Sequence, residues 1–137
     1  MESDNNNALA FWYVASCVTH IGIGAVMRSS ENQKAAYARA IGEYNKRFEA
    51  FTIGKFYGID ELAHVHVHPD KRSAVVLLFN LEDNEVERKV FLDVEAWGMA
   101  DGALRASRDG DNLSASDSSV VTWIGPLECA IVDVEIE

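Results

Sequence analysis

The chain has 137 residues, 48% of them apolar, which is enough to build one packed domain and argues against disorder of the whole chain. Twenty-two acidic and twelve basic side chains give a formal charge of −10, and no Lys/Arg cluster offsets it locally. An acidic surface repels phosphate backbones and anionic lipid, so neither nucleic acid nor a membrane surface is an expected partner.

The first predicted element is an apolar helix over residues 8–21, ALAFWYVASCVTHI. This run is too short to cross a bilayer, and the acidic, Asn-rich residues before it do not form a secretory signal. The compartment is therefore unknown, with the cytoplasm as the default. Because a helix that is apolar on all sides needs cover, we expect it to be buried against the rest of the chain or across a homodimer contact.

A second helix is predicted to begin at Ser30, because Ser30 and Gln33 have the spacing of a capping box. Gly54 is the expected end of this helix. One apolar stripe runs along about five turns, at intervals of three or four residues. Its members are Tyr37, Ile41, Tyr44, Phe48 and Phe51.

After Gly58 the apolar period changes to two, which is typical of strands. The run SAVVLLFNL indicates a central strand that is covered on both faces. The sequence therefore predicts a mainly β fold with N-terminal helices (α+β): a helical segment over residues 1–58, then an antiparallel β-sandwich over 59–137. The predicted strands lie near Leu62–His68, Ser73–Leu81, Val86–Val94, Ala103–Ser107, Ser119–Ile124 and Leu127–Ile136.

The stretch AHVHVHP places His64, His66 and His68 at alternate positions. On a strand these side chains share one face about 7 Å apart, and the valines between them face the core. His64 and His66 could hold a divalent metal such as zinc if Asp70, His20 or an acid on another strand supplied a third ligand. All three histidines in a straight row cannot converge on one ion. The favoured interpretation is a strand face that lies outside the core or under the helix.

Other patterns give weaker indications. Asp109-Gly110-Asp111-Asn112 offers oxygen ligands but lacks the spacing of a calcium loop, so we expect a hairpin turn there. Trp97 and Trp123 are candidates for stacking on a sugar ring. No serine, cysteine or pair of carboxylates has the pattern of a catalytic centre, so no catalytic residue is predicted.

The order of elements resembles the end of a large carbohydrate-active enzyme. An apolar segment and a capped helix precede GKFYGIDELAHVHVHPDKRSAVVLLFNLEDNEVERKVFLDV. The segments that carry the resemblance are KFYGIDE, AVVLLFNL and the closing PLECAIVDVEI. They are similar in style and order to glycoside hydrolases of the α-galactosidase and α-amylase kind, in which a C-terminal antiparallel β-sandwich follows a (β/α)8 barrel.

The resemblance implies a non-catalytic accessory module. A barrel needs about 250 residues, and its working carboxylates lie at the ends of barrel strands, so no catalytic residue can be carried over to this chain. We expect a fragment or stand-alone remnant without cofactor, whose apolar N-terminal helix packs on a missing catalytic barrel or on a second copy. The alternative is a small metal-binding β-sandwich or cupin-like enzyme that uses the strand histidines.

Overall fold

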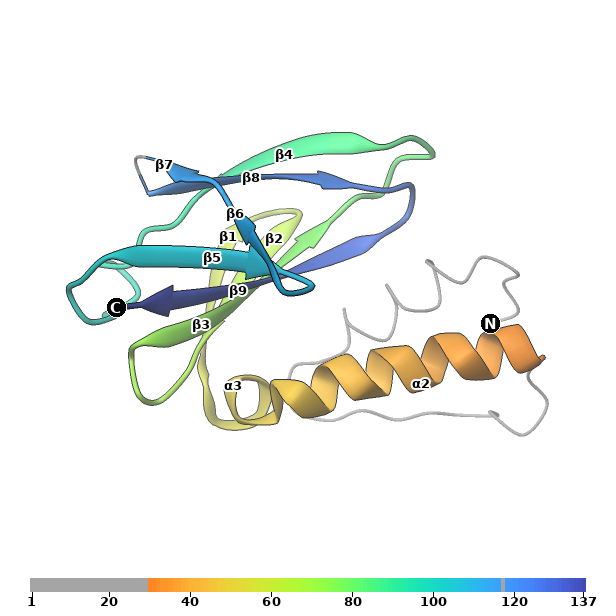
Figure 1. Ribbon diagram of the computed structural model, residues 1–137, viewed down its shortest axis with the longest axis horizontal. Helices are drawn as coiled ribbons and strands as arrows, with labels where there is room; N and C mark the ends of the chain where they lie inside the picture. Colours follow the sequence, from red (N-terminus) through yellow and green to blue (C-terminus); the bar gives the residue numbers. More distant parts are fainter. Residues whose placement is uncertain (1–29, 117) are drawn as a thin grey trace.

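The computed structural model describes residues 30–116 and 118–137, which form two helices followed by nine strands. The predicted apolar helix over residues 8–21 lies outside this range. The two helices lie along one side of the β-sandwich (Figure 1). Neither of them has the length and apolar character needed to span a bilayer. The elements are α2 (Glu31–Lys46), α3 (Phe48–Ile53), β1 (Lys55–Asp60), β2 (Ala63–Val67), β3 (Ser73–Phe79), β4 (Val86–Phe91), β5 (Leu104–Arg108), β6 (Asp111–Leu113), β7 (Ala115–Ser116), β8 (Ser119–Ile124) and β9 (Cys129–Ile136).

The predicted capping box is present at the start of α2. The Gln33 amide N–H donates to Oγ of Ser30 at 3.3 Å, and the Ser30 N–H donates to Oε1 of Gln33 at 2.9 Å. The predicted single helix is interrupted at Arg47, where φ is −117°, and α3 starts in a new phase. Phe48 therefore leaves the apolar stripe and is 52% exposed, which corrects the expectation for this residue.

The strands form two antiparallel sheets, with the orders β1-β2-β3-β9-β5-β6 and β4-β8-β7. The six predicted strands are all present, with ends shifted by a few residues at most. Strand β1 was not predicted: it crosses the expected boundary at residue 58, so the larger sheet begins inside the segment assigned to helices. Strands β6 and β7 were also missed, because two or three residues carry no periodicity. The division into two domains stays a prediction.

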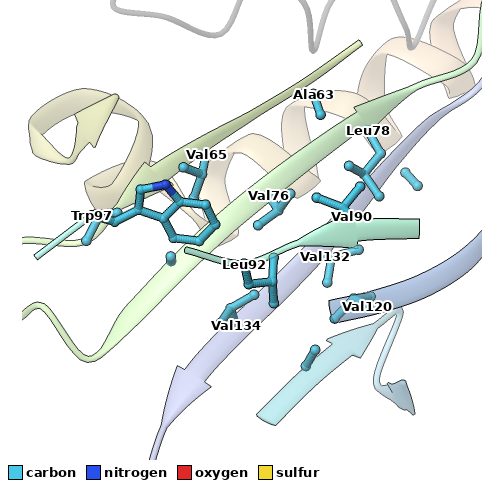
Figure 2. Packing of buried hydrophobic residues seen from close by; sticks show 14 of the residues in the cluster. Ala63, Val65, Val76, Leu78, Val90, Leu92, Trp97, Val120, Val132 and Val134 are labelled. Carbon is cyan, nitrogen blue, oxygen red and sulfur yellow. The ribbon is translucent and has the colours of Figure 1, made fainter. Parts of the chain in front are cut away.

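The main core lies between the two sheets. Figure 2 shows Val132 of the larger sheet beside Val90 and Val120 of the smaller one, with Val65 next to Trp97 in the same cluster. Strand β3 is buried on both faces, as its apolar run predicts, because its alternate residues pack under the helices. The predicted mainly β fold with N-terminal helices and an antiparallel β-sandwich is therefore confirmed.

The predicted hairpin turn joins β5 to β6. Asp109 and Gly110 have φ values of 53° and 91°, and Arg108 pairs with Asp111 across them. Two central residues with positive φ match the right-handed twist of the strands, which is why Asp-Gly is favoured at such turns.

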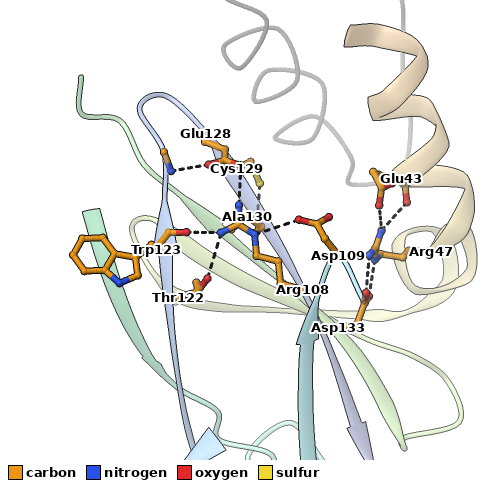
Figure 3. A network of polar contacts seen from close by, with 11 residues as sticks. Glu43, Arg47, Arg108, Asp109, Thr122, Trp123, Glu128, Cys129, Ala130 and Asp133 are labelled. Carbon is orange, nitrogen blue, oxygen red and sulfur yellow. Dashed lines mark hydrogen bonds and ion pairs between the residues drawn. The ribbon is translucent and has the colours of Figure 1, made fainter. Parts of the chain in front are cut away.

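Two arginines connect elements that are far apart in the sequence (Figure 3). Arg47 donates from Nε and Nη2 to the two carboxylate oxygens of Asp133, both at 2.6 Å, and from Nη1 to Glu43 at 2.6 Å. Arg108 contacts Glu128 at 2.7 Å and the carbonyl of Trp123. The first arginine fixes the helices to β9, and the second fixes the β5–β6 hairpin to the turn between β8 and β9.

Candidate functional site: the histidine face of strand β2

Strand β2 lies inside the larger sheet, between β1 and β3. Its alternating sequence AHVHV sends Val65 and Val67 into the main core. His64 and His66 face the opposite side, where α3 and β1 contribute neighbouring aromatic rings. His64 and His66 therefore lie on a strand face next to the helix, as the favoured interpretation of the histidine row expects.

Aromatic rings surround the two histidines. The His66 ring makes an edge contact with Phe51 at 5.0 Å between centroids and another with Phe56 at 5.5 Å. The His64 ring lies 5.2 Å from His66, 5.2 Å from Phe56 and 5.4 Å from Phe79. Both imidazoles thus pack as flat, largely apolar groups.

Burial makes His66 chemically unusual. Its side chain is 1% exposed, and Nε2 has no hydrogen-bond partner among residues 30–116 and 118–137. Burial, together with the neighbouring His64, lowers the pKa of His66 to about 4. Burial also lowers the pKa of His64. Both rings are therefore neutral near pH 7 and keep a nitrogen lone pair.

His68 has a different environment although it continues the same row. Its Nε2 lies 2.7 Å from Oε2 of Glu49, and Nδ1 lies 3.1 Å from Oδ2 of Asp70. The hydrogen bond to Glu49 raises the pKa of His68, and the Asp70 carboxylate acts in the same direction. His68 therefore links α3, through Glu49, to the end of β2.

The stability of the protein should fall as the pH is lowered through the range in which His66 titrates. The pKa of His66 is near 4 in the folded state, against 6.5 for the free side chain, so the unfolded chain binds more protons between these values. The stabilisation is complete above pH 6.5 and is lost as the pH falls towards 4. Because His66 takes up a proton in the unfolded chain, we expect the free energy of unfolding to fall by about 2 kcal/mol when the pH is lowered from 7.5 to 5.

Urea unfolding at the two pH values, on the wild type and on His66→Phe, measures this effect. Phenylalanine keeps an aromatic ring and does not titrate, so the variant should lose less stability than the wild type over this pH range. His68→Phe is the control, because the raised pKa of His68 predicts stability that is lost as the pH rises, not as it falls. Equal acid losses in the wild type and His66→Phe would contradict the assignment.

The predicted metal site stays a prediction, and only two of its ligands are placed. His64 and His66 lie side by side, but the described part of the chain holds no group of three His, Cys, Asp or Glu side chains arranged to bind a metal. Asp70, one of the suggested third ligands, faces His68 instead. His20, the other named candidate, lies outside the described residues.

The two tryptophans have opposite environments. Trp97 is 6% exposed and belongs to the main core, so the expectation that its ring offers a flat face to a sugar is corrected. Trp123 is 55% exposed on β8, and Val121 and Phe91 are also exposed on this sheet. Its role in sugar binding stays a prediction.

Sequence reasoning missed the residues that complete the histidine face. Glu49 is 19 residues from His68, and a lone acid in the first turn of a helix indicates no such partner. The predicted apolar stripe did place Phe51 on the side of the helix that meets the sheet. Phe56 could have been found only by recognising β1 as a strand, because its register sets Phe56 beside His66.

Known proteins share this fold. No family model matches the sequence, and no curated protein matches it. A protein from Bacillus halodurans C-125 described as an alpha-N-acetylgalactosaminidase matches with a TM-score of 0.67 and 15% identity, over 97% of this chain and 33% of that chain. Alpha-galactosidase I from Mortierella vinacea matches with a TM-score of 0.66 and 9% identity, over 95% of this chain and 36% of that chain. An Anoxybacillus alpha-amylase matches with a TM-score of 0.53 and 12% identity, over 80% of this chain and 24% of that chain.

These matches define the class of the fold. The chain is an antiparallel β-sandwich with helices at its N-terminal side, of a kind found within solved α-galactosidase and α-amylase chains. The predicted resemblance to these glycoside hydrolases is therefore confirmed as a likeness of fold. The chain spans about a third of the length of the first two solved chains.

Proposed function

We propose that this chain is a non-catalytic accessory module, equivalent to the C-terminal domain of a glycoside hydrolase, which packs against a catalytic (β/α)8 barrel. The likeness to one third of an α-galactosidase chain supports this proposal. The arrangement of helices that lead directly into a β-sandwich supports it as well.

The observation that carries the proposal is an apolar surface at the helical end of the sandwich. Phe48 and Ile53 of α3 and Phe56 of β1 are all more than half exposed, within nine positions of one another in the sequence. Leaving such side chains in water costs roughly 25 cal/mol for each Å² of apolar surface. A surface of this kind favours a covering partner.

Hydrolysis assays test the absence of catalysis. The purified chain is incubated with 4-nitrophenyl α-galactoside, 4-nitrophenyl N-acetyl-α-galactosaminide and soluble starch, beside a mock preparation from cells without the gene. No product should form above that of the mock preparation. Saturable hydrolysis that copurifies with the chain and is absent from the mock preparation would refute the proposal.

The apolar surface is tested with 8-anilinonaphthalene-1-sulfonate, a dye that fluoresces on exposed apolar patches. Replacing Phe48, Ile53 and Phe56 together by serine should remove most of the dye binding. The matched control replaces Leu81, Phe91 and Trp123 by serine; it removes three equally exposed side chains elsewhere and should reduce the dye binding less. An equal loss in both variants would contradict a specific surface.

Sedimentation at several protein concentrations then measures whether a second copy of the chain covers the same surface.

A metal-binding function is the second candidate, and it is favoured by Nε2 of buried His66, which has no hydrogen-bond partner in the described part of the chain. A neutral imidazole nitrogen without a donor is able to bind zinc, and His64 offers a second one nearby. Calorimetric titration with ZnCl2 on untagged protein should then give one ion per chain. Binding should be lost in the double variant His64→Phe with His66→Phe and kept in His68→Phe. The absence of any tight binding would reject this function.

Sugar stacking on Trp123 is tested by its fluorescence. Galactose or maltose should quench the tryptophan fluorescence of the wild type. The variant Trp123→Phe should show no such change, although buried Trp97 still emits. An unchanged response in the variant would exclude Trp123 as the binding ring.

A further inference from the structure

A small cleft lies at the edge of the larger sheet, beside β1. Its volume is about 170 Å³, below the roughly 300 Å³ at which pockets for drug-sized ligands begin. Val67, Pro69 and Trp97 contribute apolar lining, and Lys55, His68 and Lys71 contribute all of its ionisable groups apart from the phenol of Tyr57. Within residues 30–116 and 118–137 no carboxylate lines the cleft, although the chain as a whole carries a charge of −10.

The two lysines supply positive charge that no described carboxylate pairs with. His68 is already placed between Glu49 and Asp70. Asp70 itself accepts hydrogen bonds from the backbone N–H groups of Arg72 and Ser73, at 2.7 and 3.0 Å. Neither Lys55 nor Lys71 forms an ion pair within the described ranges.

The walls of the cleft are held in place. The ammonium of Lys55 lies 5.0 Å from the centroid of the Tyr57 ring, a cation–π contact. The Tyr57 hydroxyl donates to the carbonyl of Trp97 at 2.9 Å, which ties β1 to the turn over residues 93–98. One of the two charges is thus set beside a fixed aromatic ring.

Lys71 has an unfavourable backbone conformation. Its φ is +59°, a region in which glycine fits without steric cost and a side chain does not. Hydrogen bonds fix it there, from its N–H to the carbonyl of His68 at 2.9 Å and from the N–H of Ala100 to its carbonyl at 2.7 Å. The chain therefore keeps the Lys71 side chain at the cleft in a backbone conformation that glycine would adopt at lower cost.

From these features we infer that the cleft binds a small organic carboxylate. The carboxylate lies between the ammonium groups of Lys55 and Lys71, and the body of the ligand covers the apolar lining at Val67 and Trp97. Lysine acts as a compact point charge, which suits a carboxylate held by two separate side chains. Ile53 lines this cleft and also belongs to the apolar surface assigned above to a covering partner, so the binding is tested on the chain alone.

Benzoate and its uncharged counterpart benzamide are the probes, because they share shape and differ in charge. Titration of 15N-labelled protein, followed by the amide signals of Tyr57, Lys71 and Gly98, should give a Kd for benzoate on the order of 1 mM. The affinity for benzamide should be lower by a factor of about ten or more. Equal binding of the two probes, or no shift of these signals with benzoate, would overturn the inference.

Four variants locate the charge. Lys55→Met and Lys71→Met should each weaken benzoate binding several-fold, whereas Lys89→Met, at an exposed position of β4, should leave it unchanged. Lys71→Gly should abolish the contribution of the side chain and raise the urea midpoint, because it relieves the strained φ. An equal effect of Lys89→Met, or a lower midpoint in Lys71→Gly, would contradict a built site.

Inorganic phosphate separates an organic ligand from a simple anion. It carries charge without an apolar body, so it should bind more weakly than benzoate and shift the Gly98 signal less. Phosphate that binds as tightly as benzoate would show that charge alone is recognised, and it would overturn the organic part of the inference.

Discussion

Replacing Asn80 by aspartate is expected to destabilise the sandwich by at least about 3 kcal/mol, a large part of the roughly 5–15 kcal/mol by which a domain is stable. Asn80 is buried at the end of β3. Its Nδ2 donates to the carbonyls of Asn84 at 2.8 Å, Ile124 at 3.1 Å and Gly125 at 2.8 Å. One amide group thereby joins the end of the larger sheet to the end of β8 in the smaller one.

The substitution exchanges a donor for a second acceptor at nearly constant shape. A carboxylate would face three carbonyl oxygens, which repel it and lose their donor. Urea unfolding of Asn80→Asp at pH 7 measures the loss. The loss should shrink towards pH 4, because burial raises the pKa of the introduced carboxyl group and its neutral form can donate again.

Asn112→Asp is the matched control for this experiment. Asn112 is exposed on β6, so the same chemical change there should alter the free energy of unfolding by less than about 0.5 kcal/mol. Similar losses in the two variants would mean that added negative charge, and not the lost donor, is responsible.

Gly54→Ala should destabilise the protein by about 3 kcal/mol for a purely steric reason. Gly54 joins α3 to β1 with φ −68° and ψ 158°, values that alanine adopts easily. A Cβ atom added there would lie 2.1 Å from the carbonyl oxygen of Ala50 and 2.8 Å from that of Val67. Both contacts are with backbone, so α3 would have to move away from the sheet.

Two other glycines serve as controls, because an added Cβ meets nothing within 4 Å at either. Gly58→Ala in β1 should be close to neutral. Gly42→Ala inside α2 should stabilise the protein by about 0.5–1 kcal/mol, because alanine has the higher helix propensity. Thermal unfolding of the three variants gives the comparison. Equal unfolding temperatures for Gly54→Ala and Gly58→Ala would contradict the steric argument.

In Gly54→Ala the dye binding at Phe48 and Ile53 should also change, because α3 carries both residues.

The start of α2, the β5–β6 turn and the central position of β3 could be predicted because each depends on short-range chemistry. A capping box satisfies its own backbone groups, Asp-Gly accepts positive φ, and a continuous apolar run requires cover on both faces. Strand β1 could not be predicted in this way. Its residues KFYGID alternate only partly in burial, and Gly58 looked like the end of a helical segment.

The spacing of His64, His66 and His68 is enough to predict that they share one side of a strand, because side chains alternate in any strand. Their chemical differences depend on which residues of α3 pack against each of them. Phe51 of α3 covers His66 and lowers its pKa through burial, whereas Glu49 of the same helix reaches His68 and raises its pKa. The break of the helix at Arg47 sets the phase of α3, and no local pattern in the sequence encodes which of its residues meets which histidine.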